Sequence, residues 1–556
     1  MRTGWIVTLA LAAAGMPALA APPAKPRLIV VIAVDQFSDE LYRRYRTTFT
    51  GGLKRLGGGI SFTGYQSHAA TETCPGHSTI LTGRHPAGTG IVANTWRDQA
   101  TGAHVYCVSV PGVADPEARG PQHLRVETFG DWLKRSRPLA RVISVSGKDR
   151  AAIMLGGHHA DAVYWWKDGV GFDTSPYAGP AGELVTAPAQ AFDAAQFARW
   201  RAAPPQLWPD ALPPACAALQ QPHRFGGIEQ SGKVPPDIAI AAEKAGIDGR
   251  DFPTQLRASP IFDPMTLDFA SRLIDRNRLG HGPDTDLLAV SLSATDLIGH
   301  RYGNGGAETC VQMGALDRAL GTFLAKLDRL RVPYVVALTA DHGASDAPER
   351  AAERGVPATR IDPASFVKAL NAHLQATLAL QSPPIAGDDP QELSIVTSEP
   401  ASRARVQAAA LAWLKAQPDV VAVLTADQVV AAVTSPGKPV TALSLAERLH
   451  ESYDPARSGD IQVEFGEHVT IGMPHKAGEA VAGHGTPWDH DRRVPMLFWW
   501  PGIRPMQRKE PAETVDIAPT LAAIARVPAP PVDGRCLAIV AGSCADDARG
   551  RALSPN

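Results

Sequence analysis

Long apolar runs, rich in β-branched residues and each ending in a polar residue, recur along the chain. They read "RLIVVIAVD", "ARVISVSGK", "TDLLAVSLSATD" and "PYVVALTADH", and "VPMLFWWPG" closes the series. Near-continuous apolar runs of this length are typical of strands that are covered on both faces, as in parallel sheets. The pattern therefore predicts the strands of one buried sheet.

Helical patterns alternate with these runs. "SDELYRRYRTTF" follows the first strand, with Ser38 as a plausible N-cap, and "MGALDRALGTFLAKLDRL" and "TVDIAPTLAAIARV" come later. Strand and helix alternation predicts an α/β fold with a doubly wound, mostly parallel sheet. Ligands of such folds bind outside the carboxyl ends of the strands, where the polar residues that end the runs should lie.

Two regions interrupt the alternation. Residues 151–280 are rich in Pro, Trp and Ala, and residues 350–465 hold two helical patterns around the Pro-rich "SPPIAGDDP". We interpret both as insertions that cover the sheet of a single α/β domain spanning residues 21–556.

The first twenty residues, "MRTGWIVTLALAAAGMPALA", have the features of a secretory signal peptide. Arg2 makes a short positive region, an apolar stretch follows, and Ala18-Leu19-Ala20 fits the small-residue cleavage pattern. An uncleaved anchor is the alternative, but Gly15 and Pro17 interrupt a stretch that would need roughly 20 apolar residues to span a bilayer. We expect residues 1–20 to be removed and the mature chain to be periplasmic or secreted.

Composition narrows the class of partner. The chain has 556 residues, 44% of them hydrophobic, with 54 Lys and Arg against 56 Asp and Glu. A near-zero balance offers no electrostatic case for nucleic acid or an anionic membrane. We expect a small-molecule partner, no nucleic acid and no stable membrane insertion after cleavage. The oligomeric state stays open, with a monomer slightly favoured.

Six cysteines in an exported chain suggest disulfides. Cys536 and Cys544 lie close enough in the sequence to close a small loop. Six cysteines allow 15 pairings, so the connectivity stays open. None of them forms a CxxC zinc pattern.

Potential metal ligands occur in four separate stretches that end strands or begin loops. Three are Asp and three are His: Asp35, Asp296, His300, Asp341, His342 and His484. Nitrogen and carboxylate ligands with positions left open suit catalytic zinc, and paired metals suit in-line displacement at phosphorus. Each stretch is weak alone, because Asp35 can be a helix N-cap, D-x-x-x-H is common by chance and His484 can be structural. Their joint position at one sheet edge favours a metal centre.

The stretch "TETCPGHSTILTG" offers a nucleophile. Pro75 fits the first position of a helix, which places Thr73 just before the helix N-terminus, where backbone N–H groups favour an anion. Cys74 is the rival, although a cysteine in an exported protein is more often bridged or buried. Ser78 would lie one turn inside the helix. Without metals, Thr73 would be interpreted as a simple N-cap.

Two further motifs suit phosphate oxygens. Asn94 in "GIVANTW" follows a glycine-rich loop, and Lys148 and Arg150 in "SGKDR" lie just past a strand end. Arginine forks onto phosphate oxygens while lysine acts as a point charge. A solvated basic turn is the alternative for the Lys-x-Arg pair.

With these residues assembled, the chain resembles the alkaline phosphatase superfamily. It is most similar to the exported bacterial phosphate-irrepressible alkaline phosphatases, relatives of the type I phosphodiesterase/nucleotide pyrophosphatases. The matching stretches, from residue 27 to about 525, are "VIAVDQ", "TETCPGHSTILTGRHP", "GIVANTW", "SGKDR", "SATDLIGHRYG", "LTADHG", "HGTPWDHDRRVPMLF" and "VDIAPTLA".

The resemblance implies two Zn²⁺ ions. One would be held by Asp296, His300 and His484. The other would be held by Asp35, Asp341 and His342, with the Thr73 oxygen completing its ligands. Thr73 would attack phosphorus and form a phosphothreonine.

The same resemblance implies that Asn94 and the backbone of Thr73 and Cys74 bind one phosphate oxygen, and that Lys148 and Arg150 bind others. In the family, the Lys-x-Arg pair marks the phosphomonoesterase branch, because a monoester dianion carries one more charge than a diester. We therefore expect a phosphomonoesterase of broad specificity with weaker diesterase activity.

Three alternatives remain. A phosphodiesterase or nucleotide pyrophosphatase is the nearest, and the "KDR" stretch argues against it. A sulfatase would need a Cys or Ser followed by x-Pro-x-Arg, whereas Cys74 is followed directly by Pro75. A non-catalytic metal or phosphate binder would lack a ligand or the nucleophile, and every position is filled.

Overall fold

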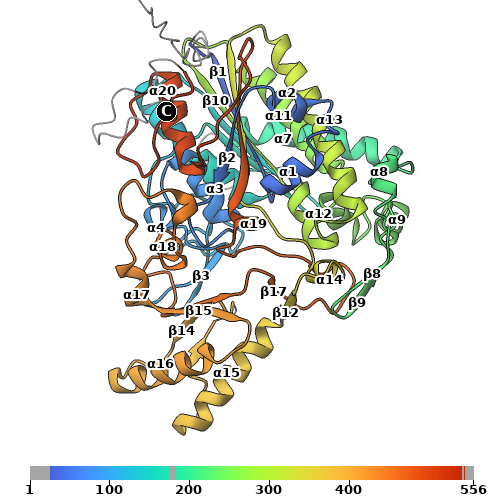
Figure 1. Ribbon diagram of the computed structural model, residues 1–556. Helices are drawn as coiled ribbons and strands as arrows, with labels where there is room; N and C mark the ends of the chain where they lie inside the picture. The colour runs from blue at the N-terminus through green and yellow to red at the C-terminus, as the bar shows by residue number, and fades with distance from the viewer. Residues whose placement is uncertain (1–24, 175–181, 388, 541–543, 545–556) are drawn as a thin grey trace, which may run out of the picture.

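The computed structural model describes residues 25–174, 182–387, 389–540 and 544. The predicted signal peptide at residues 1–20 lies outside this range. Figure 1 shows a central sheet with helices on both of its faces and a smaller helical and stranded unit at one end. Within the described ranges, no helix combines the length and the apolar composition that crossing a bilayer requires.

A ten-stranded sheet forms the centre of the molecule, in the order β19-β2-β18-β11-β1-β10-β5-β6-β7, with β20 also pairing with β2. Five neighbouring strands in the middle are parallel. They are β11 (Tyr334–Thr339), β1 (Leu28–Val34), β10 (Asp286–Leu292), β5 (Val142–Ser146) and β6 (Ala162–Lys167). The predicted doubly wound, mostly parallel sheet is confirmed.

The edges of the sheet are mixed. β18 (Arg493–Trp499) runs antiparallel to both β11 and β2 (Ile60–Tyr65), and β7 (Gly171–Asp173) runs antiparallel to β6. The apolar run of β18 resembles those of the parallel strands because burial on both faces produces the same pattern in either direction. As a result, the start of β18, rather than its end, meets the carboxyl edge of the parallel strands.

The two faces of β1 belong to two separate cores, since successive side chains of a strand point to opposite faces. Leu28, Val30 and Ile32 pack in the core that contains α11 (Phe262–Asn277) and α13 (Ala307–Arg329). The alternate residues of β1 pack with α3 (Thr73–Thr82), α5 (Phe129–Ser136) and α20 (Ile517–Ala525). Full burial of β1 fixes where the residue that follows it must lie.

The remaining elements connect or cover this framework. The helices are α1 (Asp39–Tyr45), α2 (Gly52–Leu56), α4 (Pro86–Thr89), α6 (Asp149–Gly156), α7 (Gly182–Ala202), α8 (Pro214–Ala217), α9 (Asp237–Ala245), α10 (Phe252–Arg257), α12 (Ala294–Tyr302), α14 (Pro348–Glu353), α17 (Ala426–Ala431), α18 (Leu445–His450), α19 (Asp489–Arg492), and the 3₁₀ turns η2 (Val440–Ala442) and η3 (Thr514–Asp516). The strands are β3 (Thr95–Arg97), β4 (His104–Tyr106), β8 (His223–Phe225), β9 (Ile228–Gln230), β12 (Thr359–Ile361), β17 (Val469–Ile471), β19 (Met506–Gln507) and β20 (Ala512–Glu513).

The segment predicted as the first insertion, residues 151–280, contributes to the main sheet as well as covering it. β6 and β7 extend the sheet, and α7 to α11 follow them, with α11 packed on α13. A disulfide between Cys216 and Cys310 ties the segment to α13. Two further disulfides, Cys74–Cys107 and Cys536–Cys544, use the other four cysteines.

The segment predicted as the second insertion, residues 350–465, builds most of the smaller unit in Figure 1. Two helices, α15 (Pro363–Leu378) and α16 (Pro400–Lys415), pack together and share one apolar core with a four-stranded sheet. The sheet has the order β13 (Ile385–Ala386), β14 (Glu392–Ile395), β16 (Ile461–Phe465) and β15 (Val420–Thr425). Both helices coincide with the helical patterns seen in the sequence.

Glu464 on β16 is an unusual member of this unit. Its side chain is buried, and its Oε2 atom has no hydrogen-bond partner within the described residues. Burial, with a smaller effect from Asp389, raises the pKa of Glu464 to about 8. Because the pKa of Glu464 is higher in the folded than in the unfolded chain, the protonated side chain stabilises the fold relative to the ionised one. This contribution to the free energy of unfolding is fully present below about pH 4.5 and is lost as pH rises toward 8.

We predict that Glu464→Gln removes this pH dependence, because the amide has the shape of the protonated acid and no charge to desolvate. The variant should match the wild type in thermal unfolding at pH 5 and exceed it at pH 9, by several kcal/mol if each pKa unit contributes about 1.4 kcal/mol. Glu229→Gln, at an exposed position, is the control and should show no such trend. A stability difference that is equal at both pH values would contradict the prediction.

Candidate active site

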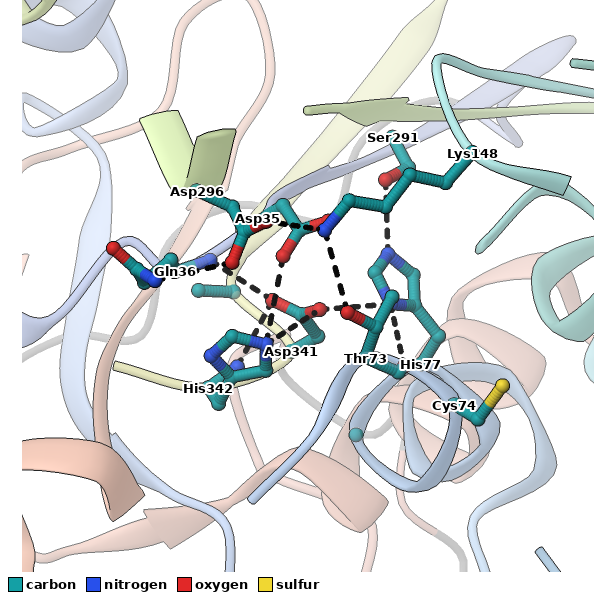
Figure 2. A network of polar contacts seen from close by, with 12 residues as sticks. Asp35, Gln36, Thr73, Cys74, His77, Lys148, Ser291, Asp296, Asp341 and His342 are labelled. Carbon is teal, nitrogen blue, oxygen red and sulfur yellow. Dashed lines mark hydrogen bonds and ion pairs between the residues drawn. The ribbon is translucent and has the colours of Figure 1, made fainter. Parts of the chain in front are cut away.

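The carboxyl edge of the parallel strands gathers the side chains that the sequence singles out. Asp35 directly follows β1, Lys148 follows β5, Asp296 lies in the first turn of α12 after β10, and Asp341 follows β11. Figure 2 shows these side chains converging on one another together with Thr73. The site thus depends on adjacent parallel strands that all end at the same edge.

The first group of possible metal ligands is Asp35, Asp341 and His342, and all three are fully buried. The His342 Nε2 atom lies 3.5 Å from Asp35 Oδ1 and 3.3 Å from Asp341 Oδ2. One ligand atom from each residue lies within 4.8 Å of the others, which is close enough to surround one cation.

The second group is Asp296, His300 and His484. Asp296 and His300 are one turn apart on α12, and His300 Nε2 lies 3.2 Å from Asp296 Oδ1. His484 arrives from the loop that precedes β18, and its Nε2 lies 3.4 Å from the same oxygen. The antiparallel direction of β18 is what brings this loop to the carboxyl edge.

The three histidines present the same nitrogen to the site. Each Nδ1 atom lies 2.8 to 2.9 Å from a backbone carbonyl oxygen: that of Ala482 for His300, Gly343 for His342 and Thr71 for His484. A carbonyl accepts only, so each Nδ1 carries the proton and donates it. Each Nε2 is therefore left as a lone pair facing the carboxylates, the arrangement that second contacts give to metal-binding histidines.

Several buried atoms of the two groups fit a cation. Asp35 Oδ1 and His342 Nε2 make no hydrogen bond within the described part of the chain. Burial, reinforced by the charges of Asp296 and Asp341, holds the pKa of Asp35 well above its usual range. The imidazole rings of His342 and His484 stack with centroids 3.7 Å apart, so the two groups adjoin. Carboxylate and imidazole donors of this kind suit zinc and similar divalent metals.

Thr73 is the first residue of α3, with Glu72 as the N-cap, and is 1% exposed. The helix begins two residues earlier than predicted, so Pro75 occupies its third position. Proline is tolerated throughout the first helical turn because the N–H groups there have no partner within the helix. Thr73 therefore lies inside the helix N-terminus rather than just before it.

Of the three residues considered as nucleophile, Thr73 has its reactive atom beside the two groups. Cys74 is joined to Cys107 in a disulfide, and Ser78 donates its hydroxyl to the Pro75 carbonyl at 2.7 Å. The Thr73 Oγ1 atom lies 3.4 Å from Lys148 Nζ. The disulfide also removes Cys74 as the free thiol that a sulfatase-type site would need.

Lys148 links the two groups. Its ammonium lies 2.5 Å from Asp35 Oδ2 and 2.6 Å from Asp296 Oδ2, one carboxylate of each group. Burial raises the pKa of Asp296, but Lys148 and His300 outweigh it and hold that pKa well below its usual range. The phosphate-binding role expected for Lys148 requires its ammonium near the nucleophile, and the contact with Thr73 meets that condition.

Asn94 is bonded to the helix N-terminus, whereas Arg150 contacts its neighbour Asp149. Asn94 Oδ1 accepts a hydrogen bond of 2.8 Å from the Cys74 N–H, and the Asn94 N–H donates to Glu72 Oε2. The Cys74 N–H, which was expected to bind a phosphate oxygen, is thus bonded to Asn94 instead. The side-chain NH₂ group of Asn94 is the donor that this residue can offer to a phosphate oxygen. Arg150 is partly buried on α6, two residues beyond Lys148.

Two residues not singled out by the sequence hold the aspartates in place. The Gln36 backbone N–H donates to Asp341 Oδ1, and its side-chain Nε2 donates to Asp296 Oδ1, both at 3.1 Å. His77 Nδ1 lies 3.0 Å from Asp341 Oδ2, and its Nε2 lies 2.9 Å from Ser291 Oγ (Figure 2). Gln36 adjoins Asp35, and His77 lies one helical turn from Thr73, so adjacency and the i, i+4 spacing were the available signals.

An α/β sheet with two adjoining Asp/His groups and a hydroxyl at its carboxyl edge offers the ligand types found in metal-dependent hydrolases. Comparison with known proteins specifies the family. The sequence model described as "Type I phosphodiesterase / nucleotide pyrophosphatase" matches residues 29–487, and the chain belongs to that family.

The relatives are alkaline phosphatases. The chain is 43% identical over 546 residues to alkaline phosphatase PhoK of Sphingomonas sp, covering 95% of this chain and 94% of that protein. The crystal structure of wild-type alkaline phosphatase PafA matches with a TM-score of 0.81 at 26% identity, covering 93% of this chain and 99% of that chain. The predicted membership of the alkaline phosphatase superfamily is confirmed, and the chain is an enzyme of the alkaline phosphatase class.

A solved variant of PafA, similar to this chain with a TM-score of 0.80 at 26% identity and the same coverage, carries four substitutions. They replace a threonine by serine and an asparagine, a lysine and an arginine by alanine. The threonine and asparagine are spaced as Thr73 and Asn94 are, and the lysine and arginine as Lys148 and Arg150 are.

Proposed function

We propose that the protein is a zinc-dependent phosphomonoesterase of broad specificity that acts through a phosphothreonine intermediate, with weaker phosphodiesterase activity. The observation that carries the proposal is the position of Thr73 Oγ1, which lies 3.4 Å from the ammonium that bridges the two Asp/His groups. The names of the alkaline phosphatase relatives and the four residue types altered in the PafA variant support it.

Asp296, His300 and His484 would hold one zinc ion. Asp35, Asp341 and His342 would hold the other, with the Thr73 oxygen as a further ligand. When bound, the two ions would supply Lewis-acid stabilisation of negative charge on the attacking and leaving oxygens. Gln36 and His77 keep the carboxylates oriented for this purpose.

Thr73 would attack phosphorus with Oγ1, forming a bond to phosphorus as the bond to the alcohol leaving group breaks. Its place in the first turn of α3 favours the alkoxide, because the helix N-terminus carries partial positive charge. The neighbouring Lys148 ammonium adds a full charge. Water then hydrolyses the phosphothreonine, releasing inorganic phosphate and restoring the Thr73 hydroxyl.

Lys148, Arg150 and Asn94 would bind the non-bridging oxygens of the transferred phosphoryl group. A monoester dianion carries one more negative charge than a diester, so two cations at its free oxygens favour the monoester. The alternative function is a phosphodiesterase or nucleotide pyrophosphatase, which the family description also covers. The relative rates on the two ester types separate these functions.

We also propose that the chain is exported, to the periplasm or beyond the cell. The three disulfides suit an oxidising compartment, and the N-terminal twenty residues have the pattern of a signal peptide.

Thr73→Ala should lower kcat by at least about 10³-fold, since removing a nucleophile leaves only binding and charge stabilisation. The zinc content should stay at the wild-type value, and acid-quenched wild type, but not the variant, should carry phosphate on the peptide that contains residue 73. Thr82→Ala on the same helix, whose hydroxyl donates to the Ser78 carbonyl, is the matched control. Wild-type turnover by Thr73→Ala would refute the assignment.

Metal removal should inactivate the enzyme, and zinc should restore it. Elemental analysis of the reloaded protein should find two zinc ions per chain, because there are two complete ligand groups. His300→Ala and His342→Ala should each lower the zinc content by about one ion per chain. Restoration by magnesium alone, or a full zinc content in both variants, would contradict the zinc sites.

The double substitution Lys148→Ala with Arg150→Ala should reduce kcat/KM for p-nitrophenyl phosphate about 10²- to 10³-fold more than for its methyl diester. Two charged hydrogen bonds of roughly 1.5–3 kcal/mol each support this magnitude. The wild type should prefer the monoester. Lys134→Ala with Arg135→Ala removes the same charges from α5 and should leave the ratio unchanged. Equal losses on both esters would favour the diesterase alternative.

A further inference from the structure

Three side chains form a polar cluster next to Arg150, and none of them has a role in the function proposed above. They are Tyr106 at the end of β4, Arg119 in the following loop and Asp149 at the start of α6. We refer to Tyr106, Arg119 and Asp149 together as the Arg150 brace.

The brace is a connected set of polar contacts. The Tyr106 hydroxyl donates to Asp149 Oδ1 at 2.7 Å, and Arg119 Nε donates to Asp149 Oδ2 at 2.9 Å. The guanidinium of Arg119 also lies 5.3 Å from the centroid of the Tyr106 ring. Both oxygens of Asp149 are therefore engaged, which fixes the carboxylate in one orientation.

Arg150 is attached to this set at two points. Its backbone N–H donates to Asp149 Oδ1 at 2.7 Å, and its guanidinium Nη1 lies 4.0 Å from the same carboxylate oxygen. Because the Tyr106 hydroxyl gives its proton to Asp149, its oxygen is free to accept from the guanidinium. Burial alone would lower the pKa of Arg150, but the interactions with Tyr106 and Asp149 outweigh burial and raise it.

The brace is also joined covalently to the nucleophile helix. Tyr106 is followed by Cys107, which forms a disulfide with Cys74, and Cys74 is the neighbour of Thr73. Both cysteines are fully buried. Tyr106 and Thr73, the residue expected to attack phosphorus, are thus each next to one end of the same disulfide.

We propose that Tyr106, supported by Asp149 and Arg119, is a positioning residue that determines specificity: it holds the Arg150 guanidinium at a fixed place relative to Thr73, where it recognises the free oxygens of a phosphate monoester. This inference rests on the proposed function, because it assigns Tyr106 a task only if Arg150 binds the substrate. A guanidinium held in advance loses less side-chain freedom when the dianion binds, so the brace strengthens monoester binding selectively.

Tyr106→Phe tests the proposal, because it keeps the ring and removes only the hydroxyl that donates to Asp149, the carboxylate beside Arg150. We expect kcat/KM for p-nitrophenyl phosphate to fall about tenfold, the lower end of the range for a hydrogen bond to a charged group. The inhibition constant of inorganic phosphate should rise by a similar factor. The kcat/KM for the methyl diester should stay within about twofold, because a diester has one charged oxygen fewer for Arg150 to bind.

A coupled substitution separates positioning from a general structural role. In an Arg150→Ala background, Tyr106→Phe should have no further effect on the monoester, since the group that it positions is gone. Tyr164→Phe is the matched control: it removes another buried tyrosine hydroxyl, one that donates to the Val185 carbonyl, and should change neither substrate. Arg119→Met should reduce monoester turnover in the same direction as Tyr106→Phe.

The outcomes distinguish this inference from the function on which it rests. An Arg150→Ala variant that loses equally on both esters contradicts the proposed function and this inference with it. A selective loss in Arg150→Ala, together with unchanged monoester turnover and phosphate inhibition in Tyr106→Phe, contradicts the brace alone. Equal losses on both esters in Tyr106→Phe also overturn it, as does a further tenfold loss in the Arg150→Ala background.

Discussion

The burial of three aspartates at one edge of the sheet is the constraint on which the rest of the site depends. Asp35, Asp296 and Asp341 are each at most 2% exposed, and their carboxylates face one another across adjacent parallel strands. Carboxylates so close together in a protein interior are unstable unless positive charge and hydrogen bonds balance them. The Lys148 ammonium and the donors of Gln36 are the balancing groups, and the Nε2 atoms of the histidines face the same carboxylates. The proposed function places divalent cations and substrate among these groups.

In the proposed function, Lys148 contacts the carboxylates expected to hold metal, whereas Arg150 belongs to a different set of contacts. Asp35 and Asp341 come close after strands that are buried on both faces, so their backbone positions are set by the main core. Arg150 instead adjoins the Tyr106, Arg119 and Asp149 contacts, which connect to the helix of Thr73 through the Cys74–Cys107 disulfide. In the function proposed here, the choice between monoesters and diesters could change without disturbing the Asp/His groups, because the brace and those groups share no side chain.

Much of this could be predicted from the sequence, because the responsible signals are local. Apolar runs that end in Asp35, Lys148, Asp296 and Asp341 identify strand ends, and parallel strands place those ends at one edge. The i, i+4 spacing of Asp296 and His300 places both on one side of α12. The helix that carries Thr73 was also visible, although its start was predicted two residues late because a proline fits any position of the first turn.

The sequence by itself therefore determined the fold class, the strand ends and the residue types at the site, since each follows from the order of apolar and polar residues over short distances. Only the tertiary structure decided what depends on contacts between distant segments. The antiparallel direction of β18 brings His484 to the edge, yet burial on both faces makes its sequence resemble a parallel strand. The contacts of Gln36 and His77 with Asp341, of Asn94 with the Cys74 N–H, and of Tyr106 with Asp149 likewise join side chains through packing, and no periodicity in the sequence encodes which polar groups will meet there.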